Sequence, residues 1–178
     1  MSDDGQVSKS PFWRFSVKFY AVPGVAPACI ELQDKAKVDV NVLFFLLWNA
    51  TQGRALNATE VAEIERAIGP WREMAVVPIR NVRRALKAPP AALTADAAEG
   101  FRTRIKAVEL EAERLQQEAL FDLAQSSRLG RPSGSSVDAA RDSVSSYQDV
   151  IGPFPPGPLA AVLSAFAKFQ GSATDKPE

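Results

Sequence analysis

The chain has 178 residues, 46% of them hydrophobic, which suits one domain with a substantial core. It has no histidine and one cysteine, so the commonest acid–base and metal-binding side chain is missing and one chain can form neither a disulfide nor a zinc-ribbon site. Its 21 basic and 21 acidic residues cancel, which gives no global attraction to nucleic acid or anionic lipid and little electrostatic protection against self-association.

The N-terminus is polar and acidic, without the basic and then apolar pattern of a signal peptide. We expect residues 1–9 to be disordered and the protein to be cytoplasmic, since a single thiol fits a reducing compartment. The most apolar run, residues 42–48, is far shorter than the roughly 20 apolar residues of a membrane span. We expect a helix buried on all sides and no membrane insertion.

Helical periods and capping signals predict a compact bundle of short helices over residues 10–88. Ser10 is a good N-cap for a first helix, and Asp39 is placed to cap the apolar one. Asn57 and Glu60 have the spacing of a capping box for a fourth helix.

A fifth helix is expected between Trp71 and Lys87, after a stop at Gly69 and a restart at Pro70. Pro78 is expected to kink or split it. Its inward face is predicted to consist of the apolar residues Met74, Val77, Val82 and Leu86.

The double proline at residues 89–90 is the best internal boundary, and a long amphipathic helix is expected over residues 92–128. Residues 131–178 are expected to form a linker, short helices and a proline-rich tail, with residues 152–158 extended. The fold class is therefore all-α. The coiled-coil-like seam of the long helix is predicted at Phe101, Ile105, Val108, Ala112, Leu115 and Ala119.

Cys29 shares a helical face with Val25 and Leu32, which indicates a small, structural core residue. As a nucleophile it would have no histidine partner. Paired glutamates such as Glu60 and Glu63 lack the histidine that completes a di-iron site, so we expect a solvated face. The sequence thus predicts no catalytic, metal or cofactor-binding residues and no cofactor.

A basic cluster is the candidate partner-binding site. Four basic side chains share one side of the predicted fifth helix, and a tryptophan stands at its start. Such a stripe can bind an acidic protein partner or phosphates, although a solvated helix face would have the same composition. The cluster consists of Trp71, Arg80, Arg83, Arg84 and Lys87.

Several blocks in the first half occur in an order that resembles a known family. They are residues 12–16, 20–26, 29–34 and 39–48, followed by Trp71-Arg72 and the arginine-rich helix. Over roughly residues 10–90 the chain is similar to the TIGR02444 family, or domain of unknown function 2390, of short proteobacterial proteins. The resemblance implies a helical protein of the bacterial cytosol and carries over no catalytic residue.

Two functions remain open. The first is a non-catalytic interaction protein: an accessory subunit, assembly factor or adaptor that binds another protein, with nucleic acid disfavoured by the zero net charge. The alternative is an enzyme or a small-molecule or cofactor-binding protein with an aromatic-lined pocket. That pocket would be formed by Trp13, Tyr20, Trp48 and Trp71.

Overall fold

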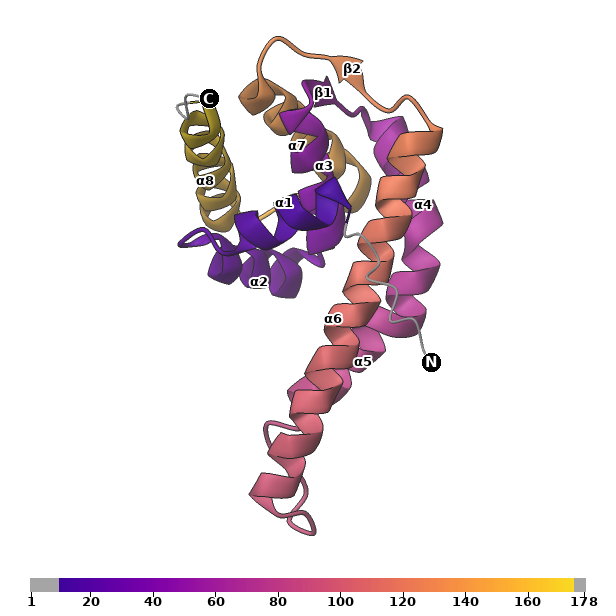
Figure 1. The fold of residues 1–178 in the computed structure, drawn as a ribbon, viewed down its shortest axis with the longest axis vertical. Helices are drawn as coiled ribbons and strands as arrows, with labels where there is room; N and C mark the ends of the chain where they lie inside the picture. Colours follow the sequence, from indigo (N-terminus) through magenta and orange to yellow (C-terminus); the bar gives the residue numbers. More distant parts are fainter. Residues whose placement is uncertain (1–9, 175–178) are drawn as a thin grey trace, which may run out of the picture.

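A computed structural model describes residues 10–174, and their side chains as far as residue 171. The expected all-α class is confirmed (Figure 1). The expectation of disorder at residues 1–9 lies outside the described residues. The helices are α1 Pro11–Tyr20, α2 Val25–Ala36, α3 Val40–Thr51, α4 Ala58–Trp71, the π-helical η1 Arg72–Val76, α5 Val77–Ala85, α6 Ala95–Ser126, α7 Ser136–Ile151 and α8 Pro156–Thr174. Two short strands, β1 Arg54–Ala55 and β2 Arg131–Pro132, pair antiparallel.

Helix α3 lies at the centre of the body, as its apolar sequence predicts. Every residue from Asn41 to Ala50 is buried. The predicted cap is present, because the Asp39 carboxylate accepts hydrogen bonds from the backbone amides of Asn41 and Val42. Among the described residues, no helix combines the length and apolar character that crossing a membrane requires.

The core extends well beyond the predicted bundle of residues 10–88. Tyr147 of α7 and Phe166 of α8 are fully buried, and Phe166 meets Phe19 of α1 edge-on with ring centroids 6.0 Å apart. The C-terminal helices are therefore part of the body rather than appendages. Their contribution follows from contacts between residues far apart in sequence, which local patterns do not encode.

The proline-rich segment is only partly extended. α7 ends at Ile151, and α8 begins at Pro156, inside the stretch 152–158 that was expected to be non-helical. Proline is tolerated in the first helical turn, where its missing amide hydrogen has no intrahelical partner. Phe154 anchors the turn, since it is buried and packs edge-on against Tyr147 at 5.4 Å.

Helix α6 runs the length of the molecule and carries a projecting arm (Figure 1). Its C-terminal half packs against the body beside α4, and its N-terminal half forms a hairpin with α5 that points away from the body. We call α5 together with residues 95–115 of α6 the arm.

The predicted stop at Gly69 is wrong. α4 continues through Pro70 to Trp71, and η1 joins it to α5. The buried face of α4, which includes Ile68 and Gly69, holds the helix together at this point. Pro78 follows directly after the π-turn, in which the amide of Val77 donates to the carbonyl of Arg72, five residues back.

The predicted inward face of the fifth helix is also wrong. Met74 is 70% exposed and Val82 is 45% exposed, whereas the neighbouring Val76 is buried. On α6 the predicted seam is only partly buried, because polar side chains occupy much of the face that packs inward. Its exposed members include Phe101, Val108 and Leu115, and the buried residues of α6 are Ala98, Glu109, Ala112, Gln116, Gln117 and Leu120.

We predict that Cys29 resists alkylation in the folded protein. The residue is 1% exposed, and burial raises the pKa of its thiol to about 12, so almost no reactive thiolate forms at neutral pH. Mass spectrometry after iodoacetamide treatment should show labelling only in denaturant. Rapid stoichiometric labelling of the native protein would contradict its structural assignment.

Candidate functional site

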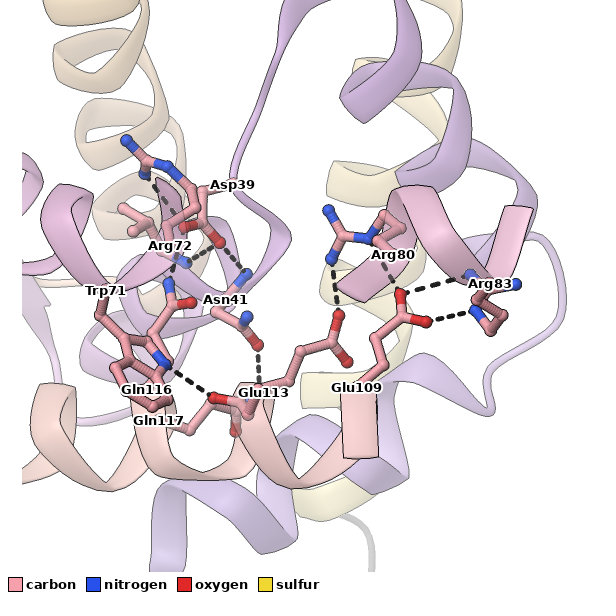
Figure 2. Close-up of polar contacts among 12 residues, drawn as sticks. Asp39, Asn41, Trp71, Arg72, Arg80, Arg83, Glu109, Glu113, Gln116 and Gln117 are labelled. Carbon is pink, nitrogen blue, oxygen red and sulfur yellow. Dashed lines mark hydrogen bonds and ion pairs between the residues drawn. The ribbon is translucent and has the colours of Figure 1, made fainter. Parts of the chain in front are cut away.

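A buried carboxylate, that of Asp39, joins three parts of the chain (Figure 2). One of its oxygens, Oδ1, caps α3 through the amide of Asn41 at 2.9 Å. The other, Oδ2, accepts hydrogen bonds from Arg72 Nη1 at 3.0 Å and from Gln116 Nε2 at 2.6 Å. The start of η1 and the middle of α6 are therefore both fixed to the start of α3.

Glu65 and Tyr147 complete this cluster. Arg72 Nη2 lies 2.8 Å from Glu65 Oε2, and the Tyr147 hydroxyl donates to Glu65 Oε1 at 2.8 Å while it accepts from the amide of Asp39. Burial alone would lower the pKa of Arg72, but hydrogen bonds and proximity to Glu65 and Asp39 raise it above its ordinary value. Burial raises the pKa of Tyr147, so the hydroxyl stays protonated. We call Asp39, Glu65, Arg72, Gln116 and Tyr147 the anchor cluster.

The arm has its own ion-pair cluster (Figure 2). Glu109 of α6 is buried and accepts hydrogen bonds from Arg80 and Arg83 of α5, while Arg80 Nη2 also lies 2.6 Å from Glu113 Oε1. The hydrogen bond to Glu109 is the main cause of the raised pKa of Arg83. Burial raises the pKa of Glu113 in spite of Arg80. These contacts close the hairpin.

The structure separates the five predicted partner-binding residues into two groups. Trp71, Arg80 and Arg83 are partly buried in intramolecular contacts; Trp71 donates from Nε1 to the carbonyl of Ala112 at 3.0 Å. Arg84 and Lys87 are exposed, and Arg84 Nη1 lies 2.9 Å from Asp34 of α2.

A groove of about 840 Å³ separates the arm from α1 and α2. Its floor includes the buried side chains of Trp13 and Phe44. Large apolar side chains on its walls are exposed by 43–54%, namely Val17, Tyr20, Ile30 and Leu110. Such a gathering of exposed apolar surface in one concavity is typical of a binding site.

Basic side chains lie along the arm side of the groove. Arg84, Lys87 and Lys106 all line it, and within the part of the chain that the structure describes the ammonium groups of the two lysines form no ion pair. Arg80, Arg83, Glu109 and Glu113 also line the groove, but they neutralise one another.

Two residues that line the groove each have a polar atom that solvent does not reach. Among the described residues, the Ser16 hydroxyl and Gln117 Oε1 form no hydrogen bond, and both residues are 4–5% exposed. The amide nitrogen of Gln117 donates to Asn41 Oδ1 at 2.7 Å (Figure 2).

The four aromatic residues of the predicted small-molecule pocket do not come together in one pocket. Trp13 and Tyr20 line the groove, Trp48 lines a second hollow of about 450 Å³ with Phe121, and Trp71 lines neither but donates a hydrogen bond to the carbonyl of Ala112 on α6. Among residues 10–174 no three acidic, cysteine or histidine side chains come close enough to hold a metal ion.

A family profile described as "protein of unknown function (DUF2390)" matches residues 11–120, which is more than half of the chain. The chain belongs to the DUF2390 family. No curated protein and no solved structure matches it. The matched segment begins with α1 and ends within α6, at residue 120. It therefore contains the groove and the arm but not α7 or α8.

Sequence reasoning missed Lys106 and Leu110, which face the groove from α6. Leu110 lies off the predicted seam, so its apolar side chain was the available signal that α6 has a second contact surface. Lys106 is one of several charged residues on this helix and carries no distinguishing signal in the sequence.

We predict that Arg72→Ala destabilises the protein by about 3–5 kcal/mol, because it leaves the Asp39 and Glu65 carboxylates buried without their cation. Urea unfolding at neutral pH measures this loss. The matched control is Arg84→Ala, whose exposed pair with Asp34 should contribute about 1 kcal/mol or less. Equal losses in the two variants would contradict the assigned role of the anchor cluster.

Proposed function

We propose that this DUF2390 member is a non-catalytic interaction protein of the bacterial cytosol, an accessory subunit, assembly factor or adaptor, whose groove binds an amphipathic helix of another protein. The observation that carries the proposal is the combination of exposed apolar walls with a basic rim, whose two lysines form no ion pair with any residue that the structure describes. Val17, Ile30 and Leu110 supply the apolar surface, and Lys87 and Lys106 supply the charge.

The apolar surface is concentrated rather than scattered. Four of the eleven large hydrophobic side chains that are exposed among the described residues line this groove. An amphipathic helix lays one apolar face into a groove of this kind and keeps its polar face towards solvent. The groove runs beside the arm, so a bound helix would contact α1 and α2 on one side and α6 on the other.

The basic rim selects the chemistry of the partner. Within residues 10–171, Lys87 and Lys106 have no counter-ion, and the exposed Arg84–Asp34 pair contributes little to stability and can exchange its partner. Acidic residues beside the apolar face of the bound helix would complement these groups. A nucleic acid fits less well, since Glu109 and Glu113 also line the groove and the walls are apolar.

The five residues of the predicted partner-binding cluster have different roles in this arrangement. Arg84 and Lys87 are assigned direct contact with the partner. Arg80 and Arg83 shape the wall, because Glu109 already holds both guanidinium groups. Trp71 fixes the base of the arm through its hydrogen bond to Ala112.

The small-molecule alternative rests on the size and lining of the same groove. The volume of about 840 Å³ is within the range of ligand pockets, about 300–1,000 Å³. A ligand with an apolar body against Trp13 and Tyr20 and an acidic group towards Lys106 would fit these side chains.

Site-specific photocrosslinking in the native host tests the proposal. A benzophenone amino acid in place of Ile30, which is 48% exposed in the groove, should give one main protein adduct. The same amino acid in place of Met74, which is 70% exposed and does not line the groove, is the matched control and should not give that adduct. Mass spectrometry should locate the crosslink in an amphipathic helix with acidic residues.

Charge variants of the rim separate specific from adventitious capture. Lys87→Glu combined with Lys106→Glu should reduce the Ile30 adduct at least tenfold, whereas arginine at both positions should preserve most of it, because the positive charge is kept. The same adducts at Ile30 and Met74 would overturn the proposal. A co-purifying small molecule in native mass spectra, without any protein adduct, would favour the alternative.

A further inference from the structure

A second exposed apolar surface lies on the arm. Phe101, Val108 and Leu115 of α6 are spaced seven residues apart and are 43–50% exposed. A spacing of seven keeps side chains on nearly one line along a helix, as in the seam of a coiled coil. No described helix covers this line, which gives α6 an unpartnered apolar stripe.

The stripe lies on the side of the arm that faces away from the groove. Val108 comes two residues before Leu110, which lines the groove, so the two side chains point about 200° apart around α6. Val82 likewise comes two residues before Arg84, which lines the groove from α5. Val82 and Val108 therefore lie on the same flank of the arm, opposite the groove.

The two valines also lie at the same level along the arm. Arg83 of α5 binds Glu109 of α6 across the antiparallel hairpin. Val82 and Val108 each come one residue before a member of this pair, so they lie at nearly the same level. Val82 is 45% exposed. We call Val82, Phe101, Val108 and Leu115 the arm strip. It holds another four of the eleven exposed large hydrophobic side chains in the described chain.

We propose that the arm strip is the interface of a homodimer in which the α6 helices of two copies pack antiparallel about a two-fold axis at Val108. In this arrangement Val108 meets Val108 of the second copy, and Phe101 meets Leu115 of the second copy. Val82 lies at the same level, so the two α5 helices also meet near the axis. Each apolar member of the strip thereby gains an apolar counterpart.

The charges beside the strip are self-complementary in this arrangement alone. Arg104 lies four residues before Val108 and Glu111 three residues after it, and both flank the same edge of the strip. An antiparallel two-fold brings Arg104 of each copy beside Glu111 of the other, which forms two ion pairs. In a parallel two-fold pair this edge of the second copy would lie on the opposite side of the interface, so Arg104 and Glu111 would not meet and neither ion pair would form.

Arg104 is available for this contact. Among the described residues it forms no ion pair, and its guanidinium lies over the exposed ring of Phe101, 5.6 Å from the centroid. In the described part of the chain, Glu111 pairs with Arg114 alone, on its own helix and at the surface, where such pairs contribute little. The chain also has zero net charge, so no global repulsion opposes association of two copies.

Cysteine crosslinking tests the dimer and its direction. The single native cysteine is buried, so each introduced thiol is the reactive one. Val108→Cys should oxidise to a disulfide-linked dimer, and Met74→Cys, exposed but outside the strip, should not. A mixture of Phe101→Cys and Leu115→Cys should crosslink far more than either variant alone. Crosslinking of Phe101→Cys with itself in preference to the mixture would overturn the antiparallel arrangement.

Sedimentation of the full chain tests the charge pairs. The unmodified protein should be a dimer, and Arg104→Glu or Glu111→Arg alone should weaken dimerisation about tenfold or more. The double exchange should restore it, because it re-forms both pairs with opposite polarity. A monomer at every concentration, or a dimer unaffected by Val108→Glu, would overturn the proposal. Neither result bears on the groove, which lies on the other side of the arm.

Discussion

The structure depends on how the first turn of α3 is capped. α3 is buried on all sides, so water does not reach its free amides and a protein group must accept their hydrogen bonds. Asp39 supplies that group, but its charge is then buried as well. A buried carboxylate is tolerated only with a cation and further donors, which Arg72 and Gln116 provide. One cap therefore binds α3, η1 and α6 to one another.

The same constraint sets the orientation of the arm. Arg72 is the first residue of η1, so the anchor cluster fixes the helix where its turns widen. The wider π-turn changes the rotation of α5 relative to α4 and directs Arg80 and Arg83 towards Glu109. Val82 then points to solvent on the far flank. The orientation of the α5 side chains that line the groove and the exposure of Val82 thus follow from one anchored turn.

Local signals in the sequence were sufficient to predict where helices begin. They were insufficient to predict which face of a helix is buried. Asp39 and Asn57 were identified as caps because a cap depends only on the few residues that follow it. Gly69 and Pro70 resemble a stop, but burial of the surrounding turn keeps the helix continuous. The inward face of α5 depends on carboxylates supplied by α6, about thirty residues later, which no periodicity of α5 itself encodes.

The arm buries charged side chains between its two helices and exposes apolar ones, and this arrangement favours binding surfaces on the arm. A hairpin selected for stability alone would bury Val82 and Val108 between its helices and expose its arginines and glutamates, since replacing buried ion pairs by apolar packing is often neutral or stabilising. In this chain Glu109 is buried while Val108 and Leu110, its neighbours on both sides, are half-exposed. The two leave opposite flanks of α6, one towards the groove and the other towards the arm strip. Exposing apolar side chains on both flanks has no benefit for the isolated hairpin, whereas it is what the two proposed contact surfaces require.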